Sequence, residues 1–372
     1  MNSAHLSRRK RRLERRQGRI FYMTWASDPR IRAYLTVAAQ IVGVAVAYHG
    51  ATRLGMMGSS IGNMSPFWPA SGVALVALMV FGLRVAPGIM LGSLPLELAL
   101  APTIVPAVGA SVGDTLGPLC GCLLLRWVGF RPELDRFKDA VALVVLGAFV
   151  ATLVNAFFGP TILLLTDQIP ERLFGPTLLI FWTGDVIGVL AAAPLLFSLR
   201  RFPQLRTMGW RAWAEIGLLA AVSFVVPFVE LREVGLFFLA FPIIAWAALR
   251  YQLIAVTPCT FIIAVVVVDA ATRGVGPFAG DDVMRRMVEL QLLNGSLVLG
   301  GLFFAVVISQ RDRARLDIER ACTRLTEVIE HIEDHESLLQ AGKLPYVKAA
   351  SELPRPPDPQ ESPQGERSPN SG

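Results

Sequence analysis

The sequence predicts an all-α polytopic membrane protein: a bundle of eight to ten transmembrane helices, then a short cytoplasmic coiled-coil helix and a disordered tail. Of the 372 residues, 53% are hydrophobic and 17% are charged, whereas soluble domains are nearer a quarter charged. Apolar runs follow one another from residue 34 to residue 309, each about as long as a membrane-spanning helix. These runs are too long and too uniform for the alternating strands of a β-barrel.

Residues 1–33 form a basic tail that we expect to be cytoplasmic. The tail carries ten Lys or Arg residues and two acidic residues. Such a cluster before the first membrane helix holds that end inside the cell and against anionic headgroups, which makes membrane lipids an expected partner. Nucleic-acid binding is the alternative for the run from Arg8 to Arg16, but no aromatic or helix-turn-helix context accompanies it. The next segment lacks a cleavage pattern, so we expect no cleavable signal peptide.

The transmembrane domain is predicted to cover residues 34–309. Apolar runs between charged or Pro/Gly-rich breaks give ten candidate spans. They lie near residues 34–52, 66–83, 85–101, 105–127, 139–165, 176–199, 214–229, 236–249, 252–271 and 287–309. The third and the eighth are short for a bilayer that needs roughly 20 helical residues. The expected number of spans is therefore eight to ten.

Positive charges in the connecting segments predict the topology. If the N-terminus is cytoplasmic, the segments on the same side carry ten Arg or Lys residues and those on the opposite side carry six. Cytoplasmic loops are the more basic ones. We therefore expect a multi-pass protein of the bacterial inner (plasma) membrane, with an even number of spans and both termini cytoplasmic. Arg285 and Arg286 oppose this bias weakly.

The segment 310–341 is predicted to form a cytoplasmic helix that pairs with a second copy of the chain. Apolar residues recur there at alternating steps of four and three, the spacing of a coiled-coil seam. They are Ile318, Cys322, Leu325, Ile329 and Ile332. The alternative is a single amphipathic helix on the membrane surface, but acids and bases are mixed beside the seam and no basic face is formed. The Pro-rich segment 342–372 is predicted to be disordered.

Ionisable residues inside apolar spans are functional candidates because they are expensive to keep in a membrane. The candidates are Glu97, Asp114, Asp185 and Asp269, with Asn155 and Asn294 as neutral companions. The alternative is structural: a hydrogen bond or ion pair between helices, with Arg84 or Arg250 as expected partners. Glu97 lies near a predicted helix end, where simple solvation is the expected state.

Asp185 has the most informative surroundings. Gly184 and Gly188 are four residues apart, so they share a helix face and allow another backbone to approach closely. Trp68 and Pro69 open the second span, and Pro is well tolerated at a helix start. The candidate ligand-binding or switch residues are Trp68, Pro69, Glu97, Asp114, Trp182, Gly184, Asp185, Arg250 and Asp269.

Other chemistry has little support. The cysteines form no metal or redox pattern, and Cys120 and Cys122 fit ordinary packing in an apolar span. The loop from Gly274 to Phe278 is predicted to be a turn, because it opens no phosphate-binding helix. We therefore expect no metal, no cofactor, no nucleic-acid partner and no catalytic residue, and hence no enzyme activity.

Five motifs in a fixed order carry a family resemblance. They are Trp68-Pro69-Ala70-Ser71-Gly72; Gly82 to Arg84 with Pro87-Gly88-Ile89 and Gly92-Ser93; Trp182-Thr183-Gly184-Asp185 with Gly188 and Pro194; Trp246 to Leu249-Arg250; and Gly274-Val275-Gly276-Pro277-Phe278. With them, residues 35–310 resemble the first type of bacterial membrane-associated sensor domain (MASE, type one). The resemblance implies a helical membrane sensor, usually of eight spans, fused to a histidine-kinase, diguanylate-cyclase or phosphodiesterase domain.

The chain departs from that plan, because we find no Gly-Gly-Asp-Glu-Phe motif, no Glu-Ala-Leu motif and no kinase ATP-binding box. His331 and His335 lack the context of a phosphoacceptor. The expected function is a sensory, signal-transducing module of a two-component type that acts on a histidine kinase or diguanylate cyclase in trans. The alternative is a secondary transporter or channel that uses buried acids such as Asp185. A lipid-modifying membrane enzyme is a third hypothesis, but no nucleophile and base pair supports it.

Overall fold

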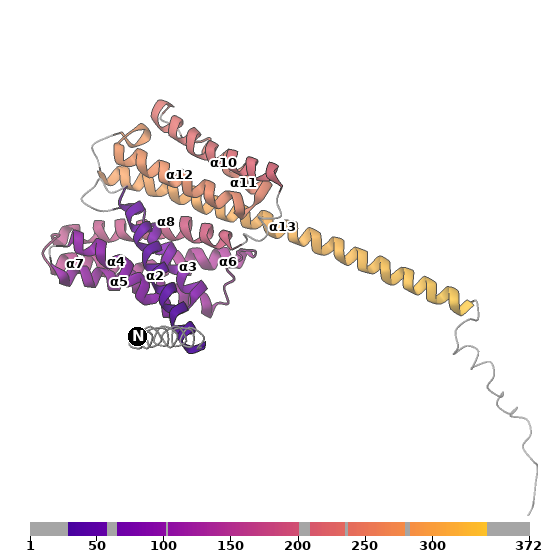
Figure 1. The fold of residues 1–372 in the computed structure, drawn as a ribbon. Coiled ribbons are helices and arrows are strands. Elements are labelled where there is room, and N and C mark those ends of the chain that lie inside the picture. Colours follow the sequence, from indigo (N-terminus) through magenta and orange to yellow (C-terminus); the bar gives the residue numbers. More distant parts are fainter. Residues whose placement is uncertain are drawn as a thin grey trace, which may run out of the picture. The chain divides into compact units, whose positions relative to one another are not determined.

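The computed structural model describes residues 29–57, 65–101, 103–200, 209–234, 237–279 and 283–340. Most of the predicted basic tail, residues 1–28, and the whole predicted disordered tail, 342–372, lie outside the described residues. The described part contains helices and their connections and no strands (Figure 1). The predicted all-α fold is confirmed.

Eight helices in the described ranges are long and apolar enough to cross a membrane. They are α2 (Pro29–Met56), α4 (Ala86–Leu100) with η1 (Leu83–Val85), α5 (Ile104–Trp127), α6 (Phe137–Ala142) with η2 (Leu143–Val150) and α7 (Ala151–Leu165), α8 (Phe174–Leu199) with η3 (Glu171–Leu173), α10 (Trp210–Val229) with η4 (Glu230–Val234), α12 (Leu253–Arg273) with η5 (Gly276–Phe278), and α13 (Val283–Gln340). Two shorter apolar helices join them, α3 (Pro69–Phe81) and α11 (Ala240–Tyr251). The predicted range of eight to ten spans is confirmed.

The prediction of which spans are short was half right. The eighth candidate is short, since α11 has 12 residues. The third is extended by η1 to 18 residues, and the second is the shorter one, because α3 has only 13 residues. The cause is local: Trp68 is not helical and Pro69 begins α3, while Gly82, with φ of +88°, ends it. A left-handed φ of this kind favours glycine.

The chain divides into two compact units, Met1–Arg311 and Asp312–Gly372. Helix α13 is continuous across this division. In the first unit, α3 packs on α8, α5 and α2, while α5 packs on α7 and α2 on α4. Helices α10 and α11 pack on α12, and α12 packs on α8. Helix α8 therefore connects the two groups of helices (Figure 1).

Glycines let the helices of the first unit approach closely, as in many membrane bundles. A Cβ atom at Gly88 or Gly92 of α4 would lie 2.5 Å from the backbone carbonyl oxygen of Ile41 or Ala45 in α2. Gly113 and Gly121 of α5 are similarly close to α7. These contacts leave no room for a side chain.

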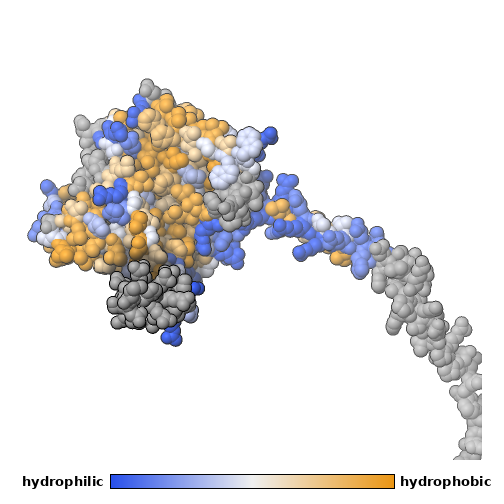
Figure 2. Space-filling view, viewed as in Figure 1, coloured by the Kyte–Doolittle hydropathy of each residue, from blue (hydrophilic) through white to orange (hydrophobic). Residues whose placement is uncertain are grey.

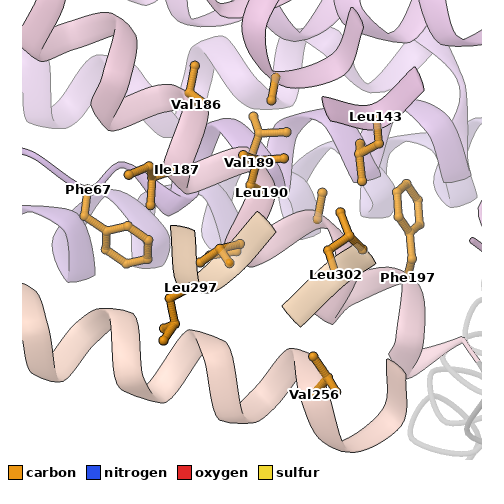
Figure 3. Close-up of a cluster of buried hydrophobic side chains, with 14 of the residues drawn as sticks. Phe67, Leu143, Val186, Ile187, Val189, Leu190, Phe197, Val256, Leu297 and Leu302 are labelled. Atoms are coloured by element: carbon orange, nitrogen blue, oxygen red, sulfur yellow. The ribbon is translucent and has the colours of Figure 1, made fainter. Parts of the chain in front are cut away.

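The core of the first unit is made of aliphatic and aromatic side chains from both groups of helices. Leu190 and Phe197 of α8 lie in one buried cluster with Val256 of α12 and with Leu297 and Leu302 of α13 (Figure 3). The first part of α13 is therefore an integral member of the bundle.

The surface of the first unit is also apolar. Large side chains such as Leu165 (76% exposed), Trp127 (83% exposed) and Val105 (71% exposed) are open to the surroundings, and apolar residues cover much of the face seen in Figure 2. Exposed apolar surface on this scale is unfavourable in water and suits lipid. The chain is a multi-pass membrane protein.

Candidate functional site

A cavity of about 260 Å³ opens among α2, α4, α5, α7 and α8. Its lining includes Met56 at the end of α2, Ala101 after α4 and Pro106 near the start of α5. The cavity therefore lies toward the end of the bundle where α2, α4 and α7 end and where α5 begins. Five polar side chains with carboxyl or amide groups line it: Glu97, Asp114, Asn155, Gln168 and Asp185.

Asp185 is 3% exposed and lies in α8. One carboxylate oxygen accepts a hydrogen bond of 2.5 Å from the Ser71 hydroxyl of α3. The other accepts one of 2.8 Å from the side-chain amide of Asn155 in α7. Asp185 therefore connects three helices at the wall of the cavity.

Asp114 in α5 repeats this arrangement. It is 7% exposed, and it accepts hydrogen bonds from the Ser93 hydroxyl of α4 and, at 3.2 Å, from the Asn155 amide. Because an amide NH₂ group has two protons, Asn155 is able to donate to both carboxyl groups at once. Asn155 thus bridges Asp114 and Asp185.

Among the described residues, Asp114 and Asp185 have no cationic partner. The residues that line the cavity include no Lys, Arg or His. The prediction that Arg84 or Arg250 pairs with these acids is wrong. Arg84 donates a hydrogen bond to the carbonyl of Phe81, and Arg250 pairs with Glu215 at 3.1 Å. The acids are satisfied instead by neutral donors that α3, α4 and α7 supply.

The predicted glycine notch is confirmed, and its partner is the backbone that leads into α3. A Cβ atom at Gly188 would lie 1.9 Å from the Trp68 carbonyl oxygen, and one at Gly184 would lie 2.9 Å from the Ser65 carbonyl oxygen. The Trp68 amide donates to the Gly184 carbonyl at 3.1 Å. Trp68 also lines the cavity, and Pro69 is buried directly after it.

Of the remaining predicted residues, one lines the cavity and three lie outside its lining. Glu97 lies in the last turn of α4, as expected, and lines the cavity. Trp182 is not part of the cavity lining, and its indole N–H donates to the Phe149 carbonyl at 2.9 Å. Asp269 is not a buried acid: its side chain is 41% exposed near the end of α12, 2.9 Å from Arg273. Arg250 likewise lies outside the cavity, on the exposed end of α11.

Sequence reasoning missed Ser71, Ser93 and Tyr48 as members of the site. Tyr48 is fully buried and within hydrogen-bonding reach of Asp114 and Trp68. Ser71 and Ser93 stand within two of the five family motifs, but hydroxyl side chains are common in membrane helices and do not by themselves indicate pairing with a distant acid. Glu230, 5% exposed in η4, is a further buried acid outside the predicted candidates and outside the cavity lining, because the predicted span 214–229 ends just before it.

The predicted pairing seam lies in α13. Ile318, Leu325, Ile329 and Ile332 are each more than half exposed, and Cys322 is exposed. Within the described ranges, no group of three His, Cys, Asp or Glu residues is placed to hold a metal ion.

The family model named MASE1 matches residues 35–312. This range agrees with the resemblance found over residues 35–310. Neither the curated proteins nor the solved structures contain a match to the chain.

Proposed function

Because the chain belongs to the MASE1 family of membrane sensor domains, we propose that it senses a molecule in the cavity and passes the signal along α13 to a separate cytoplasmic protein. The partner is a histidine kinase or a diguanylate cyclase acting in trans. The chain itself catalyses no reaction. It acts in the bacterial inner membrane with both termini in the cytoplasm.

The observation that carries this proposal is the segment from Ser65 to Trp68, which touches both the cavity and α13. Ser65 and Trp68 line the cavity. Between them, the Pro66 carbonyl accepts a hydrogen bond of 2.9 Å from the Gln291 amide of α13. A ligand that displaces Trp68 would therefore alter a direct contact with α13.

Tight packing makes this segment suitable for transmission. The contact between Gly188 and the Trp68 carbonyl leaves no space between this segment and α8. Phe67 is 2% exposed and its ring lies 5.7 Å from that of Phe261 in α12. Packed elements of this kind shift between discrete arrangements, and a ligand selects one arrangement only if it binds that one more tightly.

The output side is the exposed apolar seam of α13. Exposed Ile and Leu at coiled-coil spacing favour pairing with a second copy of the chain. We propose a homodimer in which this helix pair presents the signal to the partner protein.

Cysteine cross-linking in native membranes tests the pairing. The variant Leu325→Cys, in a background with Cys322→Ser, should give a disulfide-linked dimer under mild oxidation. Arg324→Cys, one residue away and outside the seam, is the matched control and should give much less. Intact protein without a 325–325 adduct would rule out the homodimer.

Transport is the second candidate, and the bridge of Asp114, Asn155 and Asp185 favours it, since buried acids in series are able to relay protons. Proton or solute flux in reconstituted vesicles that is lost in Asp185→Asn would establish transport. A protein that carries no flux but alters a signalling output would exclude it.

A further inference from the structure

We infer that the cavity binds a small organic cation, an ammonium group carried on an apolar body. The inference deepens the proposed function, since it takes the cavity as the place where the signal molecule binds. Its own test measures binding and does not involve α13.

The charge of the lining points to a cation. Three carboxyl groups, those of Glu97, Asp114 and Asp185, border one cavity of about 260 Å³, and no basic side chain lines it. A buried carboxylate without a counter-charge is costly. A positively charged guest removes that cost, and an anionic guest increases it.

The hydrogen bonds within the site leave acceptor positions on the carboxyl groups for such a guest. Each of Asp114 and Asp185 receives one serine hydroxyl and one proton of the Asn155 amide, and Tyr48 also lies within hydrogen-bonding reach of Asp114. A carboxylate has about four acceptor positions, so each of the two keeps acceptor capacity after these bonds. An ammonium group brings up to three donors and no acceptor, which complements this site.

The positions of the acids favour an extended molecule over a bare metal ion. A metal ion needs several ligands that converge on one point, and within the described ranges no three His, Cys, Asp or Glu side chains do so. Asp114 lies ten residues into α5 and Glu97 lies in the last turn of α4. At 1.5 Å per residue, Asp114 is about 15 Å below the start of its helix, and Glu97 is near the mouth.

The rest of the lining suits an apolar body. The aromatic side chains of Trp68 and Phe181 line the cavity together with Leu100, Ile162 and Ile169. Aromatic faces also attract ammonium groups. The combination of deep carboxyl groups and an aromatic and aliphatic wall matches an amine with a hydrocarbon chain or ring.

The test is a paired binding assay on the full-length protein in lipid nanodiscs. Propylamine, phenethylamine and 1,4-diaminobutane are each compared with the neutral counterpart, propanol, 2-phenylethanol and 1,4-butanediol, by calorimetry and thermal shift. At least one amine should bind about tenfold more tightly than its alcohol, because only the amine forms charge-assisted hydrogen bonds. If no amine binds better than its alcohol, the inference is wrong.

Variants locate the binding. Asp185→Asn and Asp114→Asn should each weaken amine binding about tenfold or more, and Asp269→Asn, outside the cavity, should not change it. If the buried variants do not fold, Glu97→Gln at the mouth should weaken binding severalfold, and Ala110→Leu should block the cavity with every carboxyl group intact. Binding that survives these last two variants would overturn the assignment.

The proposed function and the ligand assignment can be contradicted independently of each other. Amine binding with no change in cross-linking at residue 325 would keep the ligand assignment and contradict the relay. Cross-linking at residue 325 without amine binding would keep the sensory dimer and contradict the ligand assignment.

Discussion

At the scale of single residues, the glycines, which have no side chain, matter as much to the site as the polar residues do. Gly188 places the backbone of α8 against the Trp68 carbonyl, and this contact brings Asp185 of α8 within reach of Ser71 of α3. The glycine and the acid therefore act together. A residue with a Cβ atom would separate the two helices and remove the donor from the acid.

The first prediction concerns Gly188→Ala. The new methyl group would lie 1.9 Å from a backbone oxygen, which forces the helices apart and should cost about 1–3 kcal/mol. Gly217→Ala is the matched control, since its Cβ would meet nothing within 4 Å. Thermal unfolding in nanodiscs measures both. Equal stability of Gly188→Ala and the parent protein would contradict the packing described here.

The second prediction concerns Asn155→Ala. Removing the amide leaves Asp114 and Asp185 each without one donor, and an unsatisfied buried acceptor costs about 1–3 kcal/mol. Stability should fall, and the loss should be smaller when Asp114→Asn and Asp185→Asn are already present. A double-mutant cycle of unfolding measures this coupling. An unchanged loss in that background would show that Asn155 acts independently of the acids.

At the scale of elements, α13 differs from the other helices because it belongs to both compact units. Its first part is buried with α8 and α12, as Leu297 and Leu302 show, and its later part exposes an apolar seam. The proposed transmission along α13 rests on the continuity of this helix. Gln291 is the polar contact between this helix and the wall of the cavity.

The third prediction concerns Gln291→Met. Methionine keeps the volume and loses the donor to the Pro66 carbonyl, so stability should fall by about 0.5–1.5 kcal/mol. A cavity ligand should still bind, but it should no longer change the yield of the 325–325 disulfide. Gln310→Met on the same helix is the control. A response that persists in Gln291→Met would place the transmission elsewhere.

At the scale of the whole molecule, the number of crossings decides which side each loop faces. Eight long helices and the two short ones, α3 and α11, together return the described chain to its starting side if every one of them crosses. If the N-terminus is cytoplasmic, as proposed, the mouth of the cavity faces away from the cytoplasm, where an external amine has access.

The fourth prediction is this topology. In a cysteine-free background, Gln168→Cys near the cavity should react with an impermeant maleimide added outside the cell. Glu133→Cys, in the connection between α5 and α6, should react only after lysis. Both side chains are exposed, so accessibility to water is matched. The reverse pattern would contradict cytoplasmic termini.

Much of the fold was predictable because a membrane helix can be recognised from its own local composition. Ten apolar runs gave the helices, and Gly184 with Gly188 gave a close helix contact before its partner was known. The prediction was less successful where length depends on helix ends: α3 proved shorter than α4 because Trp68 and Gly82 end its regular backbone. For the site, Asp114 and Asp185 were predictable as rare buried acids, and Asp269 was misjudged because an apolar window does not reveal an exposed helix end.

The sequence by itself determined that this chain is a bundle of membrane helices, that Asp114 and Asp185 enter the bundle and where glycine permits close contact. These properties follow from the order of apolar, charged and small residues along one helix at a time. Only the tertiary structure decided that Asn155 joins Asp114 to Asp185, that serines replace the expected arginines, and that residues 65–68 touch both a cavity and α13. Such facts depend on which helices become neighbours, and many pairings bury similar apolar surface equally well.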